Sequence, residues 1–219
     1  MSQHDRGMGR RSTLKTGVAL GAAAIAGFPM IARGQGRQPI KIGMPTILSG
    51  RVAQLGVSSR NAVMLEVDKF NAAGGLDGRP IEVIVRDSRG VPAEAARIAR
   101  EMITSDRVDV IFDGEPSSGG FAVHEVVRET GTLTLHLNSE TSSLTADPRQ
   151  RFWNAFRVAR QGIHDSIAGG AYAAEIVKAR NLTRWMTVSP DYAYGRDTTA
   201  EFIEYLKAFA PNVQVIGET

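Results

Sequence analysis

The groups best placed to do chemistry lie in the segment DGEPSSGG, where Ser117 and Ser118 precede Gly119 and Gly120. Hydroxyls at the start of a helix can meet a carboxylate, because the first backbone amides of a helix have no partner within it and its dipole favours negative charge. A serine in this place also serves as an ordinary helix N-cap. The spacing therefore indicates either an anion-binding loop or a helix cap.

Motifs of common enzymes are not found in the sequence: there is no GxSxG around Ser117, no P-loop, no HExxH and no GxGxxG after the first expected strand. His124, His136 and His164 have no second histidine at metal-ligand spacing and no recognisable base-orienting partner, so we expect each to be packed or solvated. We expect no enzyme activity, no cofactor and no metal. A serine hydrolase that uses Ser117 with His124 or His136 is the alternative from another class.

The elements that must position these residues follow from periodicity. Short apolar or alternating runs, typical of strands, take turns with amphipathic runs, typical of helices. The expected strands are 40–44, 81–86, 108–112 and 133–137, and the expected helices are 58–73, 92–104 and 119–130. This alternation predicts an α/β fold with a parallel sheet wrapped by helices.

A second series follows an extended connection at 152–158. It comprises a helix at 163–179, a strand at 184–189, a helix at 198–209 and a strand at 213–217. Two strands and two helices are too few for an independent domain. We therefore predict a first lobe over 38–158 and the start of a second lobe over 159–219.

Ligands of open parallel sheets bind beyond the carboxyl ends of the strands, where loops meet the amino ends of the following helices. This rule selects the loops LSGRVAQLG, DGEPSSGG, HLNSETSSLT and SPDYAYG. They place a candidate cleft around Ser49, Ser117, residues 138–141 and Tyr194.

The first thirty-six residues are typical of a twin-arginine export signal. Arg10 and Arg11 precede an uncharged run at 16–32, which is shorter than a membrane-spanning helix and is followed by small residues. We expect cleavage between Ala32 and Gly36, export by the twin-arginine machinery and a periplasmic location. An N-terminal membrane anchor is the alternative.

Charge and composition argue against several other functions and modifications. The formal net charge is +3, but residues 1–37 hold six of the 26 basic residues and one of the 23 acidic ones, so the remainder is slightly acidic. The high isoelectric point thus gives no support for nucleic-acid binding. The chain has no cysteine, which excludes disulfides, thiol catalysis and a cysteine-linked lipid anchor.

Four segments, taken in order, resemble the periplasmic solute-binding proteins of branched-chain amino acid ABC transporters, of the leucine-binding type with the type I periplasmic binding fold. They are IKIGMPTILSGRVAQLG, NAAGGLDGRPIEVIVRDSRGVPAEAARIAREMI, VDVIFDGEPSSGG and DYAYG. The resemblance implies two α/β lobes that close on an amino acid or a related small polar or carboxylate solute, which is delivered to a transporter permease. It also implies that the chain ends partway through the second lobe. A sensor with the same fold is the alternative.

The resemblance assigns ligand-binding roles residue by residue. Ser117 matches the serine that receives the ligand carboxylate, Glu140 stands where a threonine usually binds the amino group, and Tyr194 matches an aromatic residue that closes over the ligand. The full expected set is Leu55, Ser117, Ser118, Asn138, Ser139, Glu140, Thr141 and Tyr194. The departures at Leu55, Asn138 and Glu140 point away from a branched-chain amino acid. Ser117 and Glu140 together predict a bipolar ligand.

Overall fold

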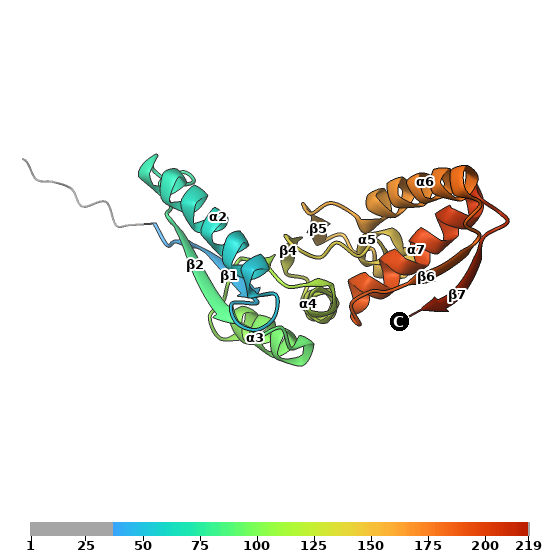
Figure 1. Cartoon of the computed structure of the whole chain (residues 1–219). Helices are drawn as coiled ribbons and strands as arrows, with labels where there is room; N and C mark the ends of the chain where they lie inside the picture. The colour runs from blue at the N-terminus through green and yellow to red at the C-terminus, as the bar shows by residue number, and fades with distance from the viewer. Residues whose placement is uncertain (1–36, 219) are drawn as a thin grey trace, which may run out of the picture. The chain divides into compact units, whose positions relative to one another are not determined.

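The computed structural model describes residues 37–218; the expected export signal, with Arg10 and Arg11, lies outside these residues. Five strands form one parallel sheet in the order β2-β1-β3-β4-β5 (Figure 1). Their bounds are β1 Ile40–Thr46, β2 Ile81–Asp87, β3 Val110–Asp113, β4 Leu133–His136 and β5 Ala155–Arg157. The predicted α/β fold with a parallel sheet is confirmed.

Helices alternate with these strands along the chain. They are α2 Ala53–Ala72, α3 Pro92–Thr104, α4 Ser117–Thr130 and the short α5 Ser143–Ala146, followed by the 3₁₀ turn η1 Pro148–Gln150. Pro92 occupies the first turn of α3, where its missing amide hydrogen costs nothing. The parallel order needs such crossover helices between neighbouring strands.

The core of this sheet is built by the apolar stripe of α3 against α4 and β3. Its fully or nearly fully buried members are Ala95, Ile98, Ala99, Met102, Val108, Ile111, Val123, Val126 and Val127. In α3 they recur at helical spacing, as an amphipathic helix requires. This packing fixes α4, and with it the start of α4 that carries Ser117 and Ser118.

A second, two-stranded parallel sheet is formed by β6 Arg184–Thr187 and β7 Gln214–Glu218. Helices α6 Gly162–Arg180 and α7 Ala193–Phe209 accompany it. A separate core of Ala173, Ala174, Val177, Leu206, Ala210 and Val213 lies between them. The described strands thus form two sheets; the lobe boundary proposed at 158/159 stays a prediction.

Three elements differ most from their predicted bounds. Helix α2 begins at Ala53 rather than at 58, and a side chain on Gly56 would come within 1.9 Å of the carbonyl oxygen of Ile47. Helix α7 begins at Ala193 rather than at 198. The expected connection at 152–158 contains a fifth strand, β5, paired with β4. Strand β5 is defined by its pairing with β4, which periodicity does not record.

Within residues 37–218, no helix has both the length and the apolar character needed to span a bilayer.

Candidate functional site

A pocket of about 340 Å³ lies at the carboxyl ends of the strands, where the sequence predicted a ligand cleft. Loops after β1, β2 and β3 line it, together with the loop between β6 and α7. The lining residues are Ile47, Arg51, Val52, Arg89, Gly90, Pro116, Ser118, Gly119, Pro190, Asp191 and Tyr192. Ligand sites of this size commonly combine apolar walls with a few polar groups.

Another hollow, of about 400 Å³, follows helix α2 along the sheet. Its lining is apolar and includes Ile42, Val67, Phe70 and Phe112; among the described residues that line it, Glu66 alone is ionisable. Convergent polar groups, which fix a ligand's orientation, are found at the strand-end pocket instead. We therefore treat the strand-end pocket as the candidate site.

The two adjacent serines at the start of α4 do different things. Ser118 lines the pocket, and its hydroxyl oxygen accepts a hydrogen bond from the backbone N–H of Ala193 at 3.0 Å. Ser117 is 2% exposed and accepts from the backbone N–H of Thr141 at 3.2 Å. Pro116 occupies the N-cap position, so neither serine is the cap that the sequence offered as an alternative.

The loop after β4 is tied to the loop after β3. Asn138 donates from Nδ2 to the carbonyl of Gly114 at 2.9 Å and accepts at Oδ1 from the hydroxyl of Ser59 at 2.7 Å. Ser139 is fully buried and donates to the carbonyl of Glu115 at 3.3 Å. Asn138 and Ser139 therefore hold the two loops together and are not among the residues that line the pocket.

Glu140 and Thr141 also lie outside the lining of the pocket. The carboxylate of Glu140 is 3.0 Å from the guanidinium of Arg160. The buried hydroxyl of Thr141 donates to Asp197 on α7. Asp197 also accepts from the backbone N–H of Ser143 at 3.2 Å, so this carboxylate holds the β4 loop from the side of α7.

Arg157 on β5 holds the same loop from the other side. Its guanidinium donates to the carbonyls of Ser139, Thr141 and Ser142 at 3.1, 2.7 and 3.2 Å, and also to the hydroxyl of Thr145. Burial lowers the pKa of Arg157, and the nearby charge of Asp197 acts in the opposite direction. This role was not predicted, because residues 152–158 were expected to form an extended connection.

An aromatic side chain near the pocket was predicted at Tyr194, but Tyr192 is the tyrosine in the lining. The two rings are 5.9 Å apart. Tyr194 lies in the first turn of α7, where its ring would be 3.3 Å from a side chain on Gly162. Leu55 lies on α2, is 37% exposed and does not line the pocket.

Asp87 fixes the loops that bring Arg51 and Arg89 to the pocket. Its Oδ1 accepts from the backbone N–H groups of Leu48 and Arg89, each at 2.8 Å, and its Oδ2 accepts from the hydroxyl of Ser49 at 2.6 Å. Asp87 ends β2, while Leu48 and Ser49 follow β1. One carboxylate therefore joins two of the loops that line the pocket.

Glu115 lies directly behind the pocket wall and is fully buried. A side chain on Gly119, which lines the pocket, would come within 2.6 Å of Glu115 Oε2. Neither carboxyl oxygen has a hydrogen-bond partner among the described residues. Burial, assisted by the charge of Asp113, raises the pKa of Glu115 to about 8, so this carboxyl is protonated at neutral pH.

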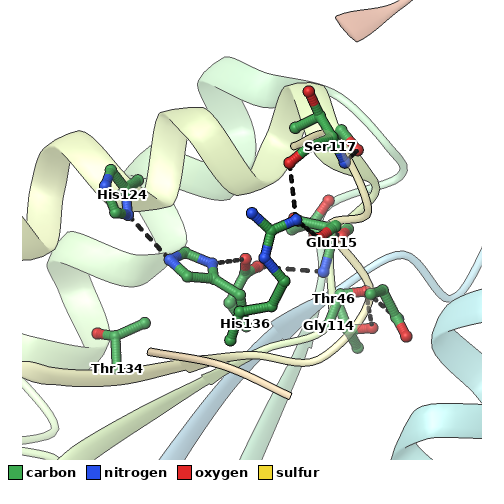
Figure 2. A network of polar contacts seen from close by, with 12 residues as sticks. Thr46, Gly114, Glu115, Ser117, His124, Thr134 and His136 are labelled. Atoms are coloured by element: carbon green, nitrogen blue, oxygen red, sulfur yellow. Dashed lines mark hydrogen bonds and ion pairs between the residues drawn. The ribbon is translucent and has the colours of Figure 1, made fainter. Parts of the chain in front are cut away.

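His124 and His136, for which the sequence showed no partner, form one buried series of hydrogen bonds beneath α4. His136 Nδ1 is 2.6 Å from Asp113 Oδ2, and His136 Nε2 is 2.9 Å from His124 Nδ1. His124 Nε2 is 2.7 Å from the carbonyl oxygen of Gln150. Figure 2 shows His124 on its helix and His136 at the end of its strand pointing toward one another. No orienting partner of either histidine was recognisable in the sequence, and the structure shows one for each; both side chains are packed, one of the two outcomes expected.

No hydrogen bond joins Ser117 to a histidine within the described part of the chain, because the ring nitrogens of His124 and His136 bond to one another, to Asp113 and to Gln150. A hydrolytic serine needs a base within hydrogen-bond reach. The arrangement around Ser117 therefore does not have the geometry of a serine hydrolase.

The fold and the strand-end pocket agree with a known family of binding proteins. The periplasmic binding protein family model matches residues 39–219, and the chain belongs to this family. The resemblance found in the sequence is thereby confirmed.

Individual relatives support the same class. Leu/Ile/Val-binding protein homolog 4 of Brucella abortus is 33% identical over 139 residues, which are 60% of this chain and 32% of the relative. A solute-binding protein of an ABC transporter from Rhodopseudomonas palustris, solved with 3,4-dihydroxybenzoic acid, is 25% identical with a TM-score of 0.69, covering 83% of this chain and 46% of that one. The leucine-, isoleucine-, valine-, threonine- and alanine-binding protein of Brucella ovis, in a closed conformation, is 26% identical with a TM-score of 0.64, covering 83% and 46%. The match to the curated relative thus spans about a third of its length, and those to the solved structures less than half.

Proposed function

We propose that this chain is a solute-binding component of an ABC importer, working outside the cytoplasm and capturing a small organic solute without chemical change. The observation that carries the proposal is the pocket of about 340 Å³, which is lined by loops from both sheets at the carboxyl ends of the strands. A pocket with walls from two sheets can close when one sheet moves toward the other.

The relatives support two solute classes for this pocket. The Brucella proteins are named for branched-chain and other aliphatic amino acids, whereas the Rhodopseudomonas protein was solved with an aromatic acid. These solutes share a carboxylate. We therefore propose a carboxylate-bearing solute, held in the pocket beside Ser118. The other expected contacts lie outside the lining of the pocket, and we propose that they contact the solute only when the cleft closes; they are Leu55, Ser117, Asn138, Ser139, Glu140, Thr141 and Tyr194.

A thermal-shift screen of the full chain tests solute binding. The panel holds the common amino acids, their amides and aromatic acids including 3,4-dihydroxybenzoate. A solute at about 100 times its dissociation constant stabilises the folded protein by about 2.7 kcal/mol, which gives a measurable rise in melting temperature. We expect a rise with at least one class. A flat response across the panel contradicts the proposal.

A matched pair of variants locates the binding. Ser118→Phe places a ring in the pocket and should abolish the shift, because Ser118 lines it. Ser58→Phe adds the same ring at an exposed position on α2 and should leave the shift unchanged. Equal shifts in both variants would place the solute elsewhere.

The partner and the export route have their own tests. We propose that a transporter permease receives the solute, and co-purification of the chain with the permease from membranes tests this against a sensor role. We also propose that the twin-arginine machinery exports the chain. Replacing Arg10 and Arg11 by lysine should then leave the precursor in the cytoplasm, and normal processing of that variant contradicts the route.

A further inference from the structure

Two arginines reach the pocket from neighbouring strands. Arg51 follows β1 and Arg89 follows β2, and β1 and β2 are paired in the sheet. None of the ion pairs or side-chain hydrogen bonds found within residues 37–218 uses either guanidinium. Guanidinium groups present planar pairs of donors that match a carboxylate. Both groups are exposed in the pocket and are available to an anionic ligand.

The carboxylates near the pocket are already balanced. Asp191 lines the pocket but pairs with Arg196, and Glu140 pairs with Arg160 outside the lining. Asp87 accepts three hydrogen bonds from the loops that it joins. Glu115, behind the wall, is protonated at neutral pH and so carries no charge that would repel an anion. Within the described residues the site therefore offers two cations and no carboxylate without a partner.

Apart from the hydroxyl of Ser118, the remaining walls are mainly apolar. Ile47 and Val52 come from the loop after β1, Pro116 from the loop before α4, and Pro190 with the ring of Tyr192 from the loop before α7. A ligand that fits such walls has a compact apolar body at a distance from its charged end. An ammonium group on that ligand would lose its hydration without gaining a carboxylate partner, which is costly.

We propose that the pocket takes an organic anion with a compact apolar body and no amino group, and that Arg51 and Arg89 bind its carboxylate. This inference rests on the proposed solute-binding function and narrows it. It replaces the bipolar ligand expected from Ser117 and Glu140, because Arg160 already neutralises Glu140. Arg51 and Arg89 are then the residues that select anions over zwitterions.

Isothermal titration of the full chain with three probes tests the inference. Benzoate is an anion with an apolar body, benzamide is its neutral counterpart, and leucine is a zwitterion. We expect benzoate to bind more tightly than benzamide and leucine by about tenfold or more, the effect of a hydrogen bond to a charged group. Raising the salt concentration should weaken benzoate binding, because both guanidinium groups are exposed.

Charge-removing variants show whether the two arginines carry the selectivity. Arg51→Gln and Arg89→Gln should each weaken benzoate about tenfold, while Arg51→Lys and Arg89→Lys should weaken it less. Arg60→Gln is the matched control: it removes a cation on α2 whose guanidinium bonds only to Asn61 in the described structure. It should leave benzoate affinity unchanged. Circular dichroism confirms that each variant is folded.

The possible failures are distinguishable. Tighter binding of leucine than of benzoate, or equal benzoate affinity in the parent and both glutamine variants, overturns the anion assignment while solute binding stands. Absence of benzoate binding while another solute of the thermal-shift panel binds also overturns the anion assignment alone, whereas a flat response across the whole panel contradicts the proposed function.

Discussion

Nδ1 of His136 lies 2.6 Å from Oδ2 of Asp113, and both side chains are completely buried between the sheet and α4. A series of hydrogen bonds runs from Asp113 through His136 and His124 to the carbonyl of Gln150. This carbonyl can only accept a hydrogen bond, so His124 Nε2 must carry a hydrogen. His124 Nδ1 then accepts from His136 Nε2. His136 Nε2 therefore uses its hydrogen for His124, and the contact between His136 Nδ1 and Asp113 needs one further proton. That proton lies between a carboxylate and an imidazole, and it balances the negative charge of the carboxylate. The network is therefore neutral overall.

Replacing His136 by leucine should destabilise the protein strongly. The substitution leaves Asp113 as a buried carboxylate without its partner, and breaking a buried pair in this way costs about 3–5 kcal/mol. Urea unfolding followed by circular dichroism measures the loss. His164→Leu is the control, because His164 lies exposed in the first turn of α6 and should change stability little. Similar losses in both variants contradict the assigned role of His136.

The network should also make the protein sensitive to acid. Burial lowers the pKa of His124, and protonating its Nδ1 would oppose two N–H groups. At His124 the unfolded state then takes up a proton more readily than the folded state as pH falls below about 6.5, so this group lowers stability in that range, against the opposite contribution of Glu115. Unfolding free energies measured from pH 7.5 to pH 5 test this. His124→Gln removes this contribution, so lowering the pH should reduce its stability less, or raise it more, than that of the parent; an unchanged slope would exclude a contribution from His124.

Glu115 should impose the opposite dependence between pH 4.5 and about pH 8. Its pKa is about 8 in the folded protein against an ordinary value of 4.5, so the folded state retains a proton that the unfolded state has released. Stability contributed by this group falls as pH rises between these values, by at most about 1.4 kcal/mol per pH unit. Glu115→Gln keeps the shape and removes the titration. Compared with the parent, it should raise stability at pH 8 relative to pH 5; an unchanged difference contradicts the prediction.

Much of the fold was predictable because the signals were local. The apolar stripe of α3 recurs at helical spacing behind Pro92, and the predicted range of 92–104 is the observed one. The four predicted strands of the first sheet are present in the structure. Strand β5 was not predicted, because its three residues are too few to show an alternating pattern and the strand is defined by its pairing with β4.

The site was less predictable because its contacts join residues far apart in sequence. The rule for parallel sheets found the loops, but it could not tell Tyr192 from Tyr194 or see that Glu140 would meet Arg160. Arg51 and Arg89 were present in the selected segments, yet free cations cannot be told from paired ones without coordinates. Similarly, nothing local links His124 on α4 to His136 on β4.

Helix α4 packs closely against the loop after β4, so we expect substitution of Gly120 to destabilise the protein. A side chain on Gly120 would lie 1.9 Å from the hydroxyl oxygen of Ser139, so Gly120→Ala should cost about 1–3 kcal/mol. Gly169→Ala is the matched helix control. Its side chain would meet Phe202 at 3.4 Å, an ordinary contact, so the gain in helix propensity should dominate. The double variant Gly120→Ala with Ser139→Gly should recover part of the loss, and thermal unfolding measures all three.

Arg157→Lys should loosen the β4 loop without unfolding the sheet. The guanidinium donates to three carbonyls and to the Thr145 hydroxyl at once, whereas a lysine ammonium cannot make all four hydrogen bonds. Amide exchange measured by mass spectrometry should quicken about tenfold over 139–145, because hydrogen bonds to a charged group are lost at a half-buried position. Arg151→Lys is the control, since Arg151 is exposed and bonds to the carbonyls of Thr145 and Ala146. Exchange that quickens equally across β1 and β3 would mean a loss of global stability, and Arg157 would then not be a specific support of this loop.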